Sequence, residues 1–297
     1  MSEILGIDLW IKRDDLTGFA MGGNKGRKLE YLMAEAQQMG ADTVVTCGAA
    51  QSNFVRQLGA ACAVLGMRCA AAVMPLPYAA VHGVPAHQGS VRGGNVTLDE
   101  LLGVDLRFFP DGDWEDLARE AEGLALEQES QGHRVYRIPI GGSSAVGAYA
   151  FVEAALEAGG FDVVVTPCSS GSTHAGLAYG FHKSTTRVIG ISCDPEPEIM
   201  EDLVRLVQEL DAFTGQRKGM TEEALDLRLD WAGEAYGVPS PAGQSALTLL
   251  ARKEGVFLDP VYTAKAFSGL IDLAHAKELR GKVLFWHTGG TPALFAE

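Results

Sequence analysis

The sequence contains no apolar run long enough to span a bilayer and no N-terminal apolar segment of the signal-peptide kind. Basic residues are also few, since 24 lysines and arginines stand against 38 aspartates and glutamates, for a net charge of −14. Because a nucleic acid or an anionic membrane attracts a basic surface, this balance argues against either of them as a partner. These absences predict a cytoplasmic protein.

Disulfide and metal-binding patterns are missing as well. The five cysteines are odd in number, and none falls in a C-x-x-C pattern. The seven histidines show no H-E-x-x-H or comparable ligand spacing. We therefore expect reduced, mostly buried thiols and no metal site.

The 297 residues suffice for one or two domains with a full core. Short apolar runs rich in β-branched residues alternate with helical patterns. The expected strands cover residues 43–47, 67–74, 106–109, 135–140, 162–166, 187–192 and 282–286. The expected helices cover residues 25–39, 54–65, 114–128, 145–158, 173–182, 197–213, 242–253 and 263–277, and residues 75–95 are expected to form a loop. Because several strands are apolar on both faces, the pattern predicts an α/β fold with parallel sheets covered on both sides.

A lysine stands at the start of a helix in the segment GGNKGRKLEY, which covers Gly22–Tyr31. Asn24 is a suitable N-cap, so Lys25 falls in the first helical turn. The field of the helix lowers the pKa of an amine there, which favours a nucleophilic or imine-forming lysine. Lys28, one turn later, is interpreted as a surface or phosphate-facing charge.

A second segment, CSSGSTHAGL, covers Cys168–Leu177 and joins a buried strand to a helix. The small side chains of Ser170, Gly171, Ser172 and Thr173 allow backbone N–H groups to converge on an anion at the helix N-terminus. The segment lacks the G-x-G-x-x-G and Walker spacings of nucleotide sites. A lysine that can form an imine, combined with a phosphate loop, predicts an enzyme that uses pyridoxal 5'-phosphate.

Three more segments could complete a site at the carboxyl ends of strands. Asn53 could bond a ring hydroxyl and Ser52 could handle a proton or a substrate carboxylate, although both also suit a plain helix cap. Thr288 follows the last strand, where its hydroxyl could meet a pyridine nitrogen or simply belong to a turn. Tyr236 and Tyr262 lie beside prolines in loop-like stretches, where either phenol could act as acid, base or substrate donor, or pack at the edge of the core.

Eight motifs now point to one family. They are IKRDDLTG, GGNKGRKLEYL, CGAAQSN, GGSSAVGAYAFVE, SSGSTHAGL, YGVPSP, DPVYTAK and HTGG, and together they extend over nearly the whole chain. By these motifs the chain resembles the 1-aminocyclopropane-1-carboxylate deaminase and D-cysteine desulfhydrase family. Its members are fold-type II pyridoxal-phosphate enzymes, similar to the tryptophan synthase β-subunit.

The resemblance implies a fold of two open, twisted, mostly parallel sheets, with a small domain inserted in a larger one. The large domain would comprise residues 1–37 and 139–297, and the small domain residues 38–138. The expected catalytic residues are Lys25, Ser52, Tyr236 and Tyr262, and the expected cofactor-binding residues are Lys25, Asn53, Ser170, Gly171, Ser172, Thr173 and Thr288. The implied partner is a small amino-acid substrate, and the implied assembly is a homodimer.

The resemblance favours D-cysteine desulfhydration, which yields pyruvate, sulfide and ammonia. Deaminases of the cyclopropane substrate carry Glu and Leu where this chain has Thr263 and Thr288, which disfavours ring opening. A cysteate sulfo-lyase would need an additional cation, and the sequence leaves open whether Arg56 supplies it. Phe54 replaces a polar residue usual in the family, which leaves a weakly active cofactor-binding protein as the alternative outside enzymology. The chain also begins close to its first motif and so lacks most of an N-terminal segment usual in the family, which implies either that another segment covers that edge or that the chain is truncated.

Overall fold

The computed structural model describes residues 1–75 and 91–297. Its strands are β1 (Asp8–Arg13), β2 (Thr43–Ala49), β3 (Arg68–Met74), β4 (Asp105–Phe108), β5 (Val135–Arg137), β6 (Val163–Cys168), β7 (Arg187–Ser192), β8 (Asp226–Arg228) and β9 (Lys282–His287). Its α-helices are α1 (Ser2–Leu5), α2 (Lys25–Gln38), α3 (Asn53–Leu65), α4 (Gly94–Leu101), α5 (Trp114–Ser130), α6 (Ala145–Leu156), α7 (Ser172–Phe181), α8 (Ile199–Thr214), α9 (Pro241–Glu254) and α10 (Thr263–His275). The strands pair in parallel in two sheets, with order β1-β9-β6-β7-β8 in the larger and β4-β3-β2-β5 in the smaller. The expected α/β fold of two parallel sheets flanked by helices is confirmed.

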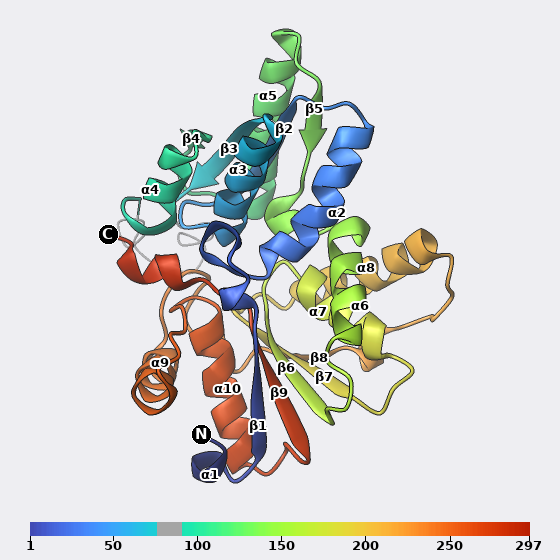
Figure 1. Cartoon of the computed structure of the whole chain (residues 1–297), viewed down its shortest axis with the longest axis vertical. Coiled ribbons are helices and arrows are strands. Elements are labelled where there is room, and N and C mark those ends of the chain that lie inside the picture. Colours follow the sequence, from blue (N-terminus) through green and yellow to red (C-terminus); the bar gives the residue numbers. More distant parts are fainter. Residues whose placement is uncertain (76–90) are drawn as a thin grey trace.

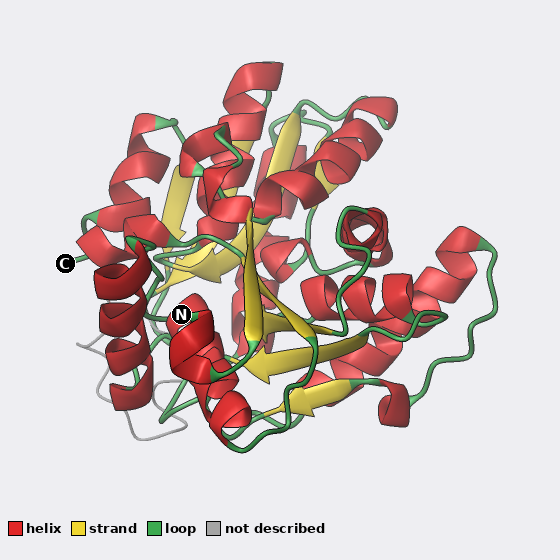
Figure 2. Cartoon of the chain, turned by 60° about the horizontal axis from the view of Figure 1, so that its bottom comes forward, coloured by secondary structure: helices red, strands yellow, loops and turns green. Residues whose placement is uncertain are grey.

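Helices cover both faces of the larger sheet because its central strands are apolar on both sides. In β6, Val164 packs with α6, α7 and α8, whereas Val163 and Val165 pack with α9 and α10 on the other face. Leu284 and Phe285 of β9 divide between the same two clusters. Figure 2 shows the helices on either side of these strands. Strands buried on both faces are typical of parallel sheets and explain the continuous apolar runs.

The smaller sheet repeats this layering with other helices. Val44 of β2 packs with α2 and α3, and the next residue, Val45, packs against α5. Figure 1 shows this sheet in the upper half of the molecule and the larger sheet below it. The carboxyl ends of the central strands of both sheets therefore approach the region between them, where ligands bind in open α/β folds.

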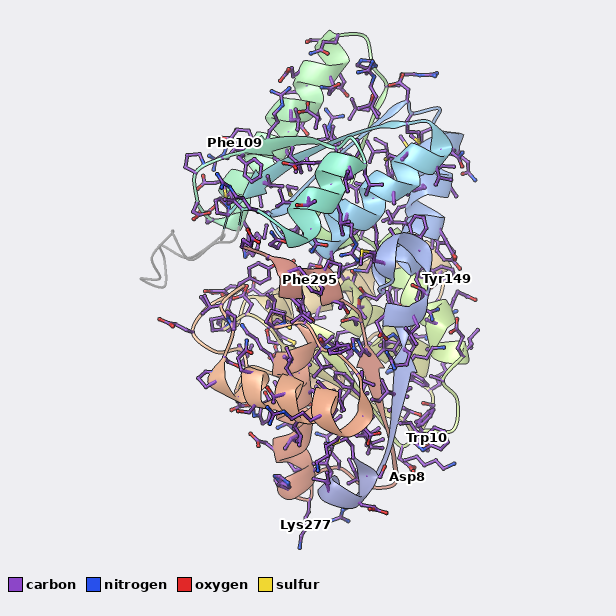
Figure 3. All side chains as sticks on the ribbon, turned by 60° about the vertical axis from the view of Figure 1, so that its left-hand side comes forward. Asp8, Trp10, Phe109, Tyr149, Lys277 and Phe295 are labelled. Atoms are coloured by element: carbon purple, nitrogen blue, oxygen red, sulfur yellow. The ribbon has the colours of Figure 1, made fainter. Side chains whose placement is uncertain are left out.

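The C-terminal segment connects the two halves. Gly93 forms an isolated bridge with Ala296, and Arg92 and Glu297 exchange backbone hydrogen bonds of 3.3 and 2.9 Å. Figure 3 shows Phe295 at the boundary between the two halves, beside the start of α4. The start of α4 is thereby held against residues that follow the larger sheet.

Several elements differ from the sequence-based expectations. The strands β1 and β8 and the helix α4 were not expected, and the expected strand at 135–140 ends at Arg137, with a 3-10 turn at Ile140–Gly142. β1 and β8 are the two edges of the larger sheet and are only partly buried, so they lack the continuous apolar pattern of the inner strands. Residues 76–90 of the expected loop lie outside the described residues, and its last two residues begin α4 instead. Glycines Gly93 and Gly94, both with positive φ, made this helix start resemble a turn.

Two further expectations concern the whole chain. All five cysteines are free and buried, as the sequence predicts. Among the helices in residues 1–75 and 91–297, none combines the length and apolar character needed to cross a bilayer.

Candidate active site

A cavity of about 420 Å³ opens where β2, β6, β7 and β9 end. Nine of the ten sequence-predicted site residues line it: Lys25, Ser52, Asn53, Ser170, Gly171, Thr173, Tyr236, Tyr262 and Thr288. Ser172 does not reach the lining, because its side chain is fully buried beneath it. The fold therefore brings together segments that lie up to 263 residues apart in the sequence.

The Lys25 amine reaches the cavity from the first residue of α2. Its enclosure by the protein lowers the pKa of the amine, since burial disfavours the charged form. A lower pKa increases the fraction of free amine, which is the nucleophilic form.

Lys28 lies one turn further along α2 and is fully buried, so its interpretation as a surface charge is wrong. Its Nζ donates to Ser172 Oγ at 2.6 Å and to the Gly141 carbonyl at 3.0 Å. Burial, followed by the charge of the neighbouring Lys25, lowers the pKa of Lys28 well below its ordinary value. Helical spacing brings the two amines to the same face of α2.

The predicted phosphate loop follows β6 and ends in the N-terminus of α7. Gly171 is the N-cap with φ 85°, a conformation that side chains rarely adopt. The first N–H groups of a helix have no intrahelical acceptor. That of Ser172 donates to the Ser170 carbonyl at 3.1 Å, and the N–H groups that follow it in the first turn can face an anion in the cavity. Ser143 Oγ donates to the Ser170 carbonyl and supports the loop from outside.

The sequence suggested that the Asn24 side chain caps α2, but it makes no capping hydrogen bond there. Instead its Nδ2 donates to Thr173 Oγ1 at 3.0 Å, which ties the residue before Lys25 to the first turn of α7. Each of these side chains thus contacts a partner about 149 residues away, which no local signal could indicate.

Ser52 and Asn53 both line the cavity at the start of α3. Ser52 is the N-cap, and its Oγ accepts from the Val55 N–H at 3.3 Å. Ser52 is thus both the N-cap of α3 and a residue of the cavity lining, because one hydroxyl can accept from the backbone and still contact a ligand.

The hydroxyls of Tyr236 and Tyr262 are hydrogen-bonded to each other at the cavity. Burial raises the pKa of both phenols, so they stay protonated at neutral pH. Trp114 contacts Tyr236 edge-on, with ring centroids 5.2 Å apart. On the other side, Asp259 Oδ2 accepts from the Tyr262 N–H at 2.9 Å and orients the start of α10.

Only one of the two threonines considered for substrate choice reaches the cavity. Thr288 lines it, whereas Thr263 is fully buried elsewhere and donates its hydroxyl to Asp259 Oδ1 at 2.6 Å. Of the two threonines, only Thr288 can therefore contact a ligand in the cavity. Phe54 also borders the cavity, with its ring packed against Gly142, where an added side chain would find no room.

Comparison with known proteins decides the family. The pyridoxal-phosphate dependent enzyme family matches residues 1–289 of the chain. The chain belongs to this family. D-cysteine desulfhydrases from Salmonella choleraesuis and Salmonella paratyphi C are each 42% identical to the enzyme, over 100% of the chain and 90% of their own length.

Solved structures agree on the fold of this pyridoxal-phosphate dependent enzyme. An ACC deaminase homologue superposes with a TM-score of 0.89 at 35% identity, covering 99% of the chain and 88% of that structure. A hydrogen sulfide-producing enzyme from Fusobacterium nucleatum superposes with a TM-score of 0.64 at 15% identity, covering 97% of the chain and 92% of that structure. The second likeness concerns the fold alone.

The donor set at the cavity fits pyridoxal phosphate, the cofactor of this family. The cavity offers an amine of lowered pKa at Lys25, a helix N-terminus at Gly171, and hydroxyl and amide side chains between them. An amine, an anion site and neutral polar groups are what an aldehyde-bearing phosphate ester of a hydroxypyridine requires. No group of three or more His, Cys, Asp or Glu side chains that could hold a metal ion occurs among the described residues.

Several residues at the enzyme's cavity were not predicted from the sequence. Trp114, Ser143 and Arg205 line it, and Lys28 lies directly beneath. Arg205 carried no signal, because it occupies an ordinary position on a charged helix, where Asp202 and Glu209 bond it at 2.7 and 2.8 Å. Lys28 did carry a signal, since it lies on the same helix face as Lys25. Arg56, left open earlier, is buried outside the lining.

Proposed function

We propose that the enzyme is a β-elimination lyase that converts D-cysteine to pyruvate, sulfide and ammonia. The observation that carries the proposal is the Lys25 amine at the same cavity as the Tyr236–Tyr262 pair. The amine of Lys25 can accept a proton there, and a phenol of the tyrosine pair can donate one. Full-length similarity at 42% identity to proteins named D-cysteine desulfhydrase supports this choice of substrate.

The cofactor would be held by groups from four segments of the chain. Lys25 would carry it covalently, and the loop that leads into α7, from Ser170 to Thr173, would bind its phosphate. Asn53 would contact the ring hydroxyl and Thr288 the pyridine nitrogen. When bound, pyridoxal phosphate supplies an electron sink for the carbanion formed at the substrate's α-carbon.

The side chains of the enzyme would move the protons. Lys25 Nζ would accept the proton from the α-carbon of the substrate. A phenol of the tyrosine pair, kept protonated by its raised pKa, donates to the departing sulfur. Ser52 Oγ contacts the substrate carboxylate. One water is consumed overall, so that D-cysteine and water give pyruvate, ammonia and hydrogen sulfide.

Two features of the cavity favour a thiol over the alternative substrates. Thr288 is a neutral hydroxyl and supports protonation of a pyridine nitrogen less than a carboxylate would, which disfavours opening of a cyclopropane ring. A sulfonate such as cysteate would need a free cation, but the guanidinium of Arg205 is engaged by Asp202 and Glu209. A thiolate is a good leaving group and needs neither.

We further propose that the enzyme is a homodimer of the cytoplasm, with residues 38–138 as a small domain inserted in a large domain of residues 1–37 and 139–297. The strands of the smaller sheet support this division, because all of them come from the one stretch between Thr43 and Arg137. Light scattering of the holoenzyme tests the dimer.

The test of the function is a pyruvate assay of the holoenzyme with D-cysteine, L-cysteine, cysteate, D-serine and 1-aminocyclopropane-1-carboxylate. D-cysteine should give the highest kcat/KM. Lys25→Ala should abolish both activity and the borohydride-reducible link to the cofactor, whereas the exposed Lys253→Ala should retain both. A higher kcat/KM for another substrate overturns the substrate, and a borohydride-reduced label at another lysine overturns the site.

A further inference from the structure

Asn95, at the start of α4, is fully buried next to the segment that carries Ser52 and Asn53. Its backbone N–H donates to Gln51 Oε1 at 2.8 Å. Its side-chain Nδ2 donates to the Gln51 carbonyl at 2.8 Å and to Asn53 Oδ1 at 3.0 Å. Both amide hydrogens of Asn95 therefore have acceptors, and one of them is the oxygen of Asn53.

Arg56 approaches the same oxygen from α3. Its Nη1 donates to Asn53 Oδ1 at 2.7 Å and also to Asn95 Oδ1. A guanidinium has donors only, so it accepts nothing from either amide and fixes both oxygens toward itself. Exchange of O and N in Asn53 would set its NH₂ group against the donors of both Arg56 and Asn95.

The remaining donors of Arg56 extend this arrangement to the turn before Lys25. Nε donates to the Ala20 carbonyl and Nη2 to the Gly22 carbonyl, each at 2.9 Å. One buried side chain thus sets the position of Asn53 relative to the turn that leads into Lys25. Arg56 and Asn95 themselves lie outside the cavity lining.

We propose that Asn95 and Arg56 are positioning residues that lock the amide of Asn53 with Nδ2 toward the cavity, so that Asn53 donates a hydrogen bond to the ring oxygen of the cofactor. The inference rests on the proposed function, which assigns Asn53 to the ring hydroxyl. Asn53 lines the cavity. Its Oδ1 accepts from Arg56 and Asn95, whereas its Nδ2 has no acceptor among the described residues. A donor at that position stabilises the deprotonated ring oxygen, because hydrogen bonding to a charged form favours that form.

The decisive variant is Asn53→Asp, tested against Asn53→Ala. Each purified apoenzyme is titrated with pyridoxal phosphate, and the absorption of the bound cofactor is followed against pH. A donor lost to Ala should weaken binding by about tenfold. Asp still accepts from Arg56 and Asn95 but presents an oxygen to the cavity, so it should bind more weakly than Ala and raise the pH of the spectral transition. If Asn53→Asp binds as the wild type does, the amide faces the other way and the proposal fails.

The positioning role is tested by Asn95→Asp, which keeps the acceptor for Arg56 but removes the donor to Asn53. In the wild-type background it should raise the pH of the spectral transition, as Asn53→Asp does. In the Asn53→Ala background it should add nothing, since the residue through which it acts is gone. Equal shifts in both backgrounds overturn the proposal. If Asn53→Ala leaves binding and spectrum unchanged, the assignment of Asn53 within the proposed function fails instead.

Discussion

Lys28 Nζ donates a 2.6 Å hydrogen bond to Ser172 Oγ, and so a buried amine joins the start of α2 to the start of α7. These are the two elements that present Lys25 and the loop around Gly171 to the cavity. A second bond of the same amine, 3.0 Å to the Gly141 carbonyl, holds the turn beside them. The relative position of Lys25 and the loop around Gly171 therefore depends on a residue outside the cavity lining.

We expect Lys28→Met to weaken binding of pyridoxal phosphate by about ten- to hundredfold, because Met fills the space but cannot donate to Ser172. Titration of the apoenzyme, followed by absorption, measures the change. Lys253→Met, an exposed substitution on α9, is the matched control. Unchanged affinity in Lys28→Met would show that the link is dispensable.

Substitutions in the loop should separate backbone from side-chain contacts to the phosphate. Gly171 has φ 85°, and an added Cβ would lie 3.2 Å from Leu206 Cδ1. Gly171→Asp brings strain and a negative charge, and should reduce cofactor affinity by at least about a hundredfold. Ser169→Ala leaves the backbone in place and should cost less than about tenfold. Comparable losses in the two variants would argue that the phosphate binds elsewhere.

The tyrosine pair should act as a proton donor over a wide pH range. Since burial raises the pKa of Tyr236, the wild-type profile of kcat/KM should show no loss from phenol ionisation below about pH 10. Tyr236→Phe removes the hydroxyl and should lower kcat/KM by about a hundredfold or more. Tyr31→Phe, which lies outside the cavity lining, serves as the control. An unaffected rate in Tyr236→Phe would exclude this phenol from catalysis.

Asp99 should make the enzyme less stable as the pH rises. Its carboxylate oxygens are buried with no hydrogen-bond partner among the described residues, and burial raises its pKa to about 8. The unfolded chain releases this proton near pH 4, about the ordinary value for Asp. Between about pH 4 and the folded-state value the native state therefore holds a proton that the unfolded state has lost, and stability falls with rising pH.

Asp99→Asn removes the titrating carboxyl group, and with it this contribution to the pH dependence of stability. The free energy of unfolding of the variant, measured with urea at pH 5 and pH 7.5, should fall less than that of the wild type. The difference should reach at most about 1.4 kcal/mol for each pH unit. The exposed Glu120→Gln should behave as the wild type does. A parallel pH dependence of variant and wild type would mean that Asp99 is ionised in the native state.

Local signals predicted the inner elements well, and the reason is their burial. The strand at Arg187–Ser192 has the bounds that the sequence predicts, and five of its six residues are buried. The edge strand β1 was missed because none of its residues is fully buried, and its pairing with β9 joins residues 274 positions apart. The helix α4 was missed because two glycines precede its periodic residues, and its start depends on the C-terminal segment.

The sequence by itself determined the α/β alternation, the helix that begins at Lys25, and the small-residue turn between β6 and α7, because hydrophobic periodicity and turn chemistry are local properties. Only the tertiary structure decided what the side chains contact. Asn24, expected to cap a helix, bonds Thr173 instead, and Lys28 lies beneath the loop rather than on the surface. The tertiary structure also left Thr263 bonded to Asp259, away from the cavity. The partner of a polar group is set by whichever distant segment packs against it, and a linear pattern does not contain that information.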